Sequence, residues 1–365
     1  MGDPALIVIA GPTAVGKTAA AMALADLVPA EVVCADSRVI YRGMDIGTAK
    51  PSPADRKQVA HHLLDIARPD QVVTLAEYQR LAGLAIAGIR ARNRVPLLVG
   101  GTGLYIRAVV DGFQIPAAPP DWRLRAALEA EERAGGSGTL HRRLLQIDPE
   151  AARRIHPHNV RRVIRALEVQ AKADRKPIEA WSSTKVSEEC PLRGLHTGVE
   201  QPACRGWSKG KTGAPISALR RPATGAGDER PPAQTAPRVQ VAHPAPGPVV
   251  MIALVADRAR LYERIHRRID QQLAGGLVEE VRALLAAGYA KTLPALQALG
   301  YKEMVPYLEG SVSLEEARAA FQRNTRRYAK RQLTWFRGDP RYRWLDVGDD
   351  PPEVVAGRIR AMITV

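Results

Sequence analysis

The sequence predicts an α/β fold, in which helices flank a parallel sheet and a small all-helical insertion interrupts the chain. The first observation is that short apolar runs at Leu6–Ala10, Glu31–Ala35, Val95–Val99 and Val249–Val255 alternate with helical stretches. Strands that are apolar throughout are typical of parallel sheets covered on both faces. The second observation is that residues 115–182 contain apolar residues at helical spacing and no strand pattern.

The pattern divides the chain into four segments. Residues 1–114 and 249–365 carry the alternation of strands and helices, so we expect them to form two parts of one sheet domain. The helical insertion is expected at residues 115–182, after a proline-rich boundary. Residues 183–248 hold 10 Pro and 8 Gly among 66 residues without apolar periodicity, and we expect them to be disordered.

The second part of the sheet domain is predicted to contain a strand, three helices and a final strand. Their expected bounds are Val249–Val255, about Leu261–Leu273, Leu277–Ala287, about Ser313–Phe336 and Arg343–Val347. The helix at Ser313–Phe336 is thus expected to be the last one in the chain.

Composition and charge narrow the class of protein. The 365 residues include 53 Lys+Arg and 38 Asp+Glu, a net charge of +15 that predicts a polyanionic partner, nucleic acid first. Apolar runs stay well below the ~20 residues of a membrane span, and no basic stretch precedes the first apolar run. Three cysteines without a CxxC pair exclude a disulfide scaffold and an all-cysteine zinc site. We therefore expect a cytoplasmic protein with no membrane partner.

A phosphate-binding motif follows the first apolar run. The motif G-x-x-x-x-G-K-[ST] is matched by Gly11, Pro12, Thr13, Ala14, Val15, Gly16, Lys17 and Thr18. In such a P-loop, backbone N–H groups cradle phosphate oxygens at a helix N-terminus, the lysine contacts the terminal phosphates, and the hydroxyl suits Mg²⁺. A strand before it and an Ala-rich helix after it favour this interpretation over a glycine turn with an incidental lysine. The motif predicts a P-loop NTPase-like sheet that binds a phosphate ester with Mg²⁺, without specifying a nucleotide.

Polar residues follow two further strands. Asp36 and Ser37 come after the second apolar run, and Thr102 lies in the glycine-rich turn after the third. Because ligands bind outside the carboxyl ends of parallel strands, we expect these residues to face the P-loop. Three roles are open for Asp36: Mg²⁺ ligand, general base, or N-cap of the next helix. The turn at Thr102 could also be a plain connection from strand to helix.

Two basic stretches are predicted to contact RNA. Residues 317–338 contain seven Lys/Arg and no acid, with Tyr328, Trp335 and Phe336 between them. Cations with stacking aromatics suit an RNA backbone with exposed bases, although a solvated helix face is the alternative. A second cluster, Arg161, Arg162 and Arg165, lies on one predicted helix of the insertion.

Eight stretches of the chain resemble, in order, the tRNA dimethylallyltransferase family, also called tRNA isopentenyltransferases. They are residues 11–18, 36–51, 61–65, 99–105, 161–169, 257–265, 297–303 and 329–337. The run at 36–51 after a P-loop is the most specific of them. The absence of cysteine after Cys204 favours the bacterial type, which lacks a C-terminal zinc finger. Residues 183–248 depart from the family, whose members usually have a much shorter link there.

The resemblance implies a reaction. Dimethylallyl diphosphate would donate its prenyl group to N6 of the adenosine 3′ of the anticodon, in tRNAs that read codons beginning with U. The P-loop would hold the diphosphate, with Lys17, Thr18 and Mg²⁺ neutralising its charge. Asp36 would act as general base, Thr102 would lie near the reacting centre, and Arg258 would contact the diphosphate.

The resemblance also implies how the tRNA anticodon stem-loop is bound. The target base would leave its stack to reach a buried donor. Four residues of the insertion would grip the stem-loop, with others around the base and on the opposite side. The implied tRNA-binding residues are Asp36, Ser37, Arg38, Val39, Thr102, Arg125, Arg161, Arg162, Arg165, Gln297, Lys330 and Arg331. We expect the protein to be a monomer.

Three other functions compete with this hypothesis. A P-loop kinase acting on a small metabolite would not need the two basic stretches. A prenyltransferase acting on free adenine nucleotides would not need them either, so they favour a large RNA. A non-catalytic RNA-binding protein would leave the P-loop, Asp36 and Thr102 without a role.

Overall fold

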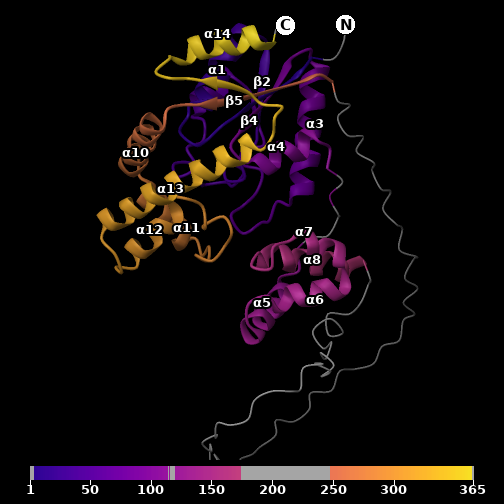
Figure 1. Cartoon of the computed structure of the whole chain (residues 1–365). Helices are drawn as coiled ribbons and strands as arrows, with labels where there is room; N and C mark the ends of the chain where they lie inside the picture. The colour runs from indigo at the N-terminus through magenta and orange to yellow at the C-terminus, as the bar shows by residue number, and fades with distance from the viewer. Residues whose placement is uncertain (1–3, 114, 116–119, 174–246, 364–365) are drawn as a thin grey trace, which may run out of the picture. The chain divides into compact units, whose positions relative to one another are not determined.

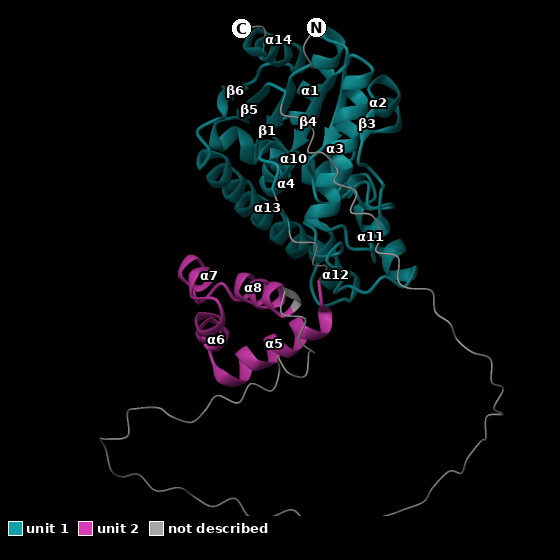
Figure 2. Cartoon of the chain, turned by 90° about the vertical axis from the view of Figure 1, so that its right-hand side faces the viewer, with its two compact units in different colours: residues 1–119, 241–365 teal, residues 120–240 magenta. Residues whose placement is uncertain are grey.

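The computed structural model describes residues 4–113, 115, 120–173 and 247–363, and Figure 1 traces the chain. It contains two compact units, coloured separately in Figure 2. Residues 1–119 and 241–365 form the first unit, and residues 120–240 form the second. The disorder expected for 183–248 concerns residues that, except for 247 and 248, lie outside the described ones.

A six-stranded parallel sheet forms the centre of the first unit, which confirms the predicted fold class. The strands are β1 (Leu6–Ala10), β2 (Ala30–Cys34), β3 (His61–His62), β4 (Val95–Gly100), β5 (Val249–Val255) and β6 (Arg343–Asp346). Their order in the sheet is β3-β2-β4-β1-β5-β6. Residues distant in sequence therefore meet at the sheet centre, where β1 pairs with both β4 and β5.

Helices cover both faces of this sheet (Figure 1). Those of the first unit are α1 (Lys17–Leu27), α2 (Pro53–Gln58), α3 (Leu75–Ala91), α4 (Gly103–Val110), α10 (Arg258–Ala274), α11 (Leu277–Ala286), α12 (Tyr301–Leu308), α13 (Leu314–Arg337) and α14 (Pro352–Ile363). Because successive strand residues face opposite ways, Ile7 and Ile9 pack into one apolar cluster with α1 and α10. Val8 belongs to the other cluster, with α3 and α4.

The structure adds three elements to those predicted. Strand β3 has two residues, too few for a recognisable alternation. Helix α12 contains Pro306, and α14 contains Gly357, which lower the helical signal of each segment. The prediction that the helix ending near Phe336 is the last one was therefore wrong. Contacts with α1 offset the weak propensity of α14, which buries Val355 and Ile359.

The described part of the second unit is helical, as the fold class predicted. Its helices are α5 (Trp122–Gly135), α6 (Thr139–Ile147), α7 (Pro149–Arg154) and α8 (Val160–Ala173). The side chains of Asp121 and Asp148 accept hydrogen bonds at the N-termini of α5 and α7. Leucines and other apolar residues from all four helices form a small core of their own. No helix among the described residues of either unit is long and apolar enough to cross a membrane.

Candidate active site

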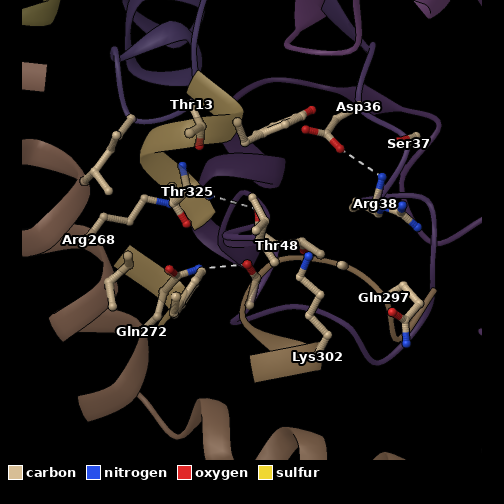
Figure 3. A pocket seen from close by; sticks show the side chains of 18 of the residues that line it. Thr13, Asp36, Ser37, Arg38, Thr48, Arg268, Gln272, Gln297, Lys302 and Thr325 are labelled. Carbon is tan, nitrogen blue, oxygen red and sulfur yellow. Dashed lines mark hydrogen bonds between the residues drawn. The ribbon is translucent and has the colours of Figure 1, made fainter. Parts of the chain in front are cut away.

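Three strand ends meet at one cavity of about 290 Å³ in the first unit. Thr13 follows β1, Asp36 follows β2 and Thr102 follows β4, and all three line this cavity. Helices α10 and α13 contribute Arg268, Thr325 and Tyr328 to its other walls. Lys302, in the first turn of α12, also lines it. Figure 3 shows the labelled side chains arranged around the space. The convergence expected from strand order is present.

The P-loop has the strained backbone that the motif requires. Gly11 and Gly16 have φ angles of 144° and 103°, and a Cβ on Gly11 would lie 2.6 Å from the carbonyl oxygen of Leu254. Lys17 Nζ donates a hydrogen bond of 2.7 Å to the carbonyl oxygen of Pro12. Burial, and secondly the charge of Arg268, lower the pKa of Lys17 to about 7. An anion beside this lysine would restore its charge.

A second cavity of about 100 Å³ adjoins the first and is lined by P-loop residues. Thr13, Asp36, Thr48, Arg268 and Tyr328 line both. The inner cavity also has polar residues of α1 and an apolar side that suits a small hydrocarbon group. Its further lining residues include Lys17, Thr18, Val32, Cys34, Val39 and Val99.

Asp36 is held by the segment that follows it. Its Oδ1 accepts a hydrogen bond of 2.8 Å from the backbone N–H of Arg38. After Asp36 the next helix is α2, which begins at Pro53, so the N-cap role left open for Asp36 is excluded. The neighbouring N–H of Ser37 donates to Thr102 Oγ1 at 3.1 Å, which joins the ends of β2 and β4. These contacts fix the segment around Asp36, and Asp36 lines the cavity.

The structure offers oxygen ligands of the kind that Mg²⁺ prefers. Among the described residues there is no group of three or more His, Cys, Asp or Glu side chains that could hold a metal. Thr18 and Asp36, however, both line the inner cavity. The Thr18 hydroxyl suits a Mg²⁺ ion whose other ligands are phosphate oxygens and water, so the residues present fit this ion, and Asp36 could serve either as a further ligand or as a base.

Several lining residues were missed by the sequence reasoning, and Arg268 and Gln332 are the most telling. Arg268 of α10 lines both cavities. Gln332 of α13 lines the inner cavity, and its Oε1 accepts a hydrogen bond of 2.9 Å from the N–H of Thr13. A sequence signal existed for Gln332, because it lies four residues before Phe336 and at helical spacing from Thr325 and Ala329, all of which are buried. Because polar side chains are seldom buried, a polar residue on the buried face of a helix is a candidate site residue.

The other predicted site residues of the first unit lie in three places. Val39 lines the inner cavity alone. Ser37, Arg38, Gln297 and Arg331 line the larger cavity. Arg258 and Lys330 instead line a separate hollow of about 410 Å³ between α10 and α13. There Arg258 Nε donates to the Tyr262 hydroxyl at 3.1 Å.

The aromatic residues of α13 differ in exposure. Tyr328 lines the cavity, and Trp335 is 40% exposed. Phe336 is fully buried in the core against Tyr342, because its position falls on the apolar stripe of α13. The expectation that Phe336 stacks on bases was therefore wrong.

The predicted arginines of the second unit fall into two groups. Arg161 and Arg162 are exposed on α8. Arg125 and Arg165 donate to the fully buried carboxylate of Glu168 at 2.9 and 2.6 Å. Burial alone would raise the pKa of Glu168, but the hydrogen bonds it accepts, first from Arg125, lower it to about 2. The second pair thus has a structural role that the spacing did not reveal.

The fold and the cavity define a P-loop protein with a phosphate site next to a carboxylate and a small apolar space. Comparison with known proteins identifies the family within this class. The family model for IPP transferase matches residues 39–205 and 211–339. The chain belongs to this family, and it is accordingly an enzyme, a prenyltransferase.

Individual relatives agree with the family match. A tRNA dimethylallyltransferase of Desulforudis audaxviator is 44% identical over 355 residues, which are 97% of this chain and 96% of the relative. One of Symbiobacterium thermophilum is 43% identical over 94% of this chain and 89% of its own. The resemblance noted in the sequence is thereby confirmed.

Solved structures show the same fold. The full-length tRNA isopentenylpyrophosphate transferase of Bacillus halodurans has a TM-score of 0.61 and 36% identity, covering 99% of this chain and 96% of its own. A eukaryotic dimethylallyltransferase acting on tRNA has a TM-score of 0.66, covering 98% of this chain and 78% of its own. At its 22% identity the likeness concerns the fold alone.

Proposed function

We propose that the protein transfers the dimethylallyl group of dimethylallyl diphosphate to N6 of the adenosine 3′ of the anticodon, in tRNAs that read codons beginning with U. The observation that carries the proposal is the position of Asp36, which lines both the larger cavity and the cavity that contains Lys17. A base entering the first and a diphosphate held at the second would meet at this carboxylate. The names of the relatives support the choice of donor and acceptor.

The reaction needs one bond to break and one to form. The allylic C–O bond breaks with its electron pair going to the diphosphate, and the N6 lone pair forms the new N–C bond. Asp36 accepts the proton that N6 loses, which keeps charge from accumulating on the amine. Thr102 lies beside Asp36 through its hydrogen bond from Ser37, and it orients the base near the reacting atoms.

The residues of the P-loop hold the leaving group. The backbone N–H groups of residues 14–16 bind phosphate oxygens, since Pro12 has no N–H and that of Thr13 donates to Gln332. Lys17 and Arg268 supply positive charge from the inner cavity. We propose that Arg258, at the start of α10, also contacts the diphosphate, for which its guanidinium must turn from the Tyr262 hydroxyl toward the P-loop. Mg²⁺, bound through Thr18, would neutralise charge on the departing diphosphate.

The basic residues bind the anticodon stem-loop. Gln297 and Arg331 at the larger cavity and Lys330 nearby on α13 contact the loop around the target base. Exposed Arg161 and Arg162 contact phosphates, and Arg125 and Arg165 support them through Glu168. We further propose that the protein acts as a monomer in the cytoplasm, where unmodified tRNA is available.

The decisive experiment combines the protein, dimethylallyl diphosphate, Mg²⁺ and unmodified tRNA, followed by nucleoside mass spectrometry. We expect one prenyl group on adenosine with the wild type and none with Lys17→Ala. Asp36→Asn should lower kcat about 10²–10⁴-fold while tRNA binding is kept. Asp26→Asn, an exposed change on α1, serves as the matched control.

Other outcomes point to the competing functions. Full activity of Asp36→Asn would exclude Asp36 as the base. Prenylation of AMP but not of tRNA would establish the free-nucleotide enzyme instead. ATP consumption with a small metabolite, and no prenyl transfer, would establish the kinase.

A further inference from the structure

One carboxylate outside the cavity holds the turn that forms part of the cavity wall. Glu280 of α11 accepts hydrogen bonds from the backbone N–H groups of three consecutive residues. Its Oε2 accepts from Asp45 and Ile46, both at 2.8 Å, and its Oε1 accepts from Gly47 at 3.1 Å. Consecutive backbone N–H groups that all donate to one carboxylate hold that stretch of backbone in one conformation, because hydrogen bonds to a charged acceptor are strong.

A tyrosine completes this contact. The hydroxyl of Tyr301, at the start of α12, donates to Glu280 Oε1 at 2.5 Å. Its ring lies against Gly47, where an added Cβ would be 2.4 Å from ring carbon Cε2. The turn can therefore approach Tyr301 only because residue 47 is glycine.

The opposite edge of the turn is held from α10. Gln272, which is 6% exposed, donates through Nε2 to the carbonyl oxygens of Ile46 and Gly47, each at 2.8 Å. Arg268 donates to the carbonyl oxygen of Thr48 at 3.3 Å. Both hydrogen-bonding edges of the turn are thus occupied, and its conformation depends on side chains 220 or more positions away in sequence.

This turn faces the reacting groups. Gly47 and Thr48 line the larger cavity, and Thr48 also lines the inner one together with Asp36 and Arg268. The labelled view of Figure 3 has Thr48 between Arg268 and the side where Lys302 and Gln297 lie. A shift of the turn would change the space that the acceptor base enters, while the P-loop would keep its place.

We infer that Glu280, with Tyr301, is a positioning residue for prenyl transfer, which fixes the 45–48 turn as the wall against which the acceptor base is placed. The inference rests on the proposed function. It predicts a selective defect. Loss of this contact should lower kcat/KM for the acceptor tRNA, whereas the affinity of the P-loop for the diphosphate should not change.

The main variant is Glu280→Gln, which keeps the size of the side chain but turns an amide N–H₂ toward backbone N–H groups. We expect kcat/KM for tRNA to fall about 10–100-fold, because small misplacements of a reactant carry losses of this order. The Kd of inorganic pyrophosphate should stay within about twofold. Tyr301→Phe removes one of the four hydrogen bonds, so its fall should be smaller, about fivefold.

Glu279→Gln is the matched control, since Glu279 is exposed on the same helix and forms an ion pair of 3.6 Å with Arg282. It should leave all these quantities unchanged. Amide hydrogen exchange at residues 45–47 provides a second readout. Exchange should be at least about tenfold faster in Glu280→Gln than in Glu279→Gln, because the amides lose their acceptor.

The outcomes separate the two proposals. If the wild type prenylates no RNA, the proposed function fails, and the exchange rates still test the positioning by itself. Unchanged exchange in Glu280→Gln overturns the positioning. An active wild type with Glu280→Gln equal to Glu279→Gln in kcat/KM overturns the role in the reaction. Loss of pyrophosphate binding in both Glu280→Gln and Tyr301→Phe would indicate a general structural role and overturn the inference too.

Discussion

Gln332 and Thr13 lie 319 positions apart in sequence, yet the Oε1 atom of Gln332 accepts a hydrogen bond of 2.9 Å from the N–H of Thr13. The Nε2 atom of the same side chain donates to the carbonyl oxygen of Gly101 at 2.8 Å. A single buried amide of α13 thus bridges the two glycine-rich loops that follow β1 and β4. The bridge fixes the P-loop relative to the turn that contains Thr102.

The bridge makes Gln332→Glu informative. The substitution replaces the Nε2 donor by an oxygen that faces the carbonyl of Gly101, so one hydrogen bond becomes a repulsion. We expect the Kd of inorganic pyrophosphate, measured by isothermal titration calorimetry, to rise about tenfold, or about 1.4 kcal/mol. Gln322→Glu on the same helix lies outside the bridge and should have little effect. Equal affinity of the two variants would show that the bridge does not shape the P-loop.

The fold could be predicted from sequence because its signals are local. Strands β1, β4 and β5 are continuous apolar runs, and the P-loop motif lies between a strand and a helix, so short windows sufficed. Strand β3 and helix α14 lacked such signals. Strand β3 has only two residues and is stabilised by pairing with β2. Helix α14 contains a glycine and is stabilised by packing on α1, which lies outside any short sequence window around it.

The site could be predicted only in part, because some of its residues have local sequence signals and others depend on long-range contacts. Asp36 and Thr102 follow strands directly, so the topology brings them to the P-loop. Glu280 and Arg268 gain their meaning from contacts with residues more than 200 positions away. In sequence they are ordinary charged residues on amphipathic helices. Spacing also gave no sign that Arg165 pairs with Glu168, which is buried by folding of the helical unit.

The lowered pKa of Lys17 predicts a pH-dependent stability. The pKa is about 7 in the folded protein against 10.5 in an unfolded chain, so between these values the unfolded chain binds a proton that the folded chain does not. The stability contributed by this group therefore rises from pH 7 to pH 10.5, and burial of the charge costs most at or below pH 7. Lys17→Met should be more stable than the wild type at pH 6.5 by roughly 2–4 kcal/mol, and nearly equal to it near pH 10.5.

Urea unfolding of both proteins at pH 6.5 and pH 9.5 measures this difference. Lys57→Met, an exposed change on α2, corrects for the general loss of one lysine. A stability gain of Lys17→Met that is equal at both pH values would contradict the assignment. The variant should also lose pyrophosphate binding, since the same buried charge that destabilises the fold neutralises the phosphates.

The helical unit allows structural and RNA-binding arginines to be told apart. Arg125→Ala leaves the buried Glu168 carboxylate with fewer donors and should lower the free energy of unfolding of this unit by about 3 kcal/mol. Arg161→Ala changes an exposed residue and should alter that free energy by less than about 0.5 kcal/mol, while it weakens tRNA binding and reduces the slope of log Kd against log salt by about 1. Urea unfolding and tRNA titrations at several salt concentrations measure both effects. A stable Arg125→Ala with the salt slope of Arg161→Ala would instead make Arg125 a phosphate contact.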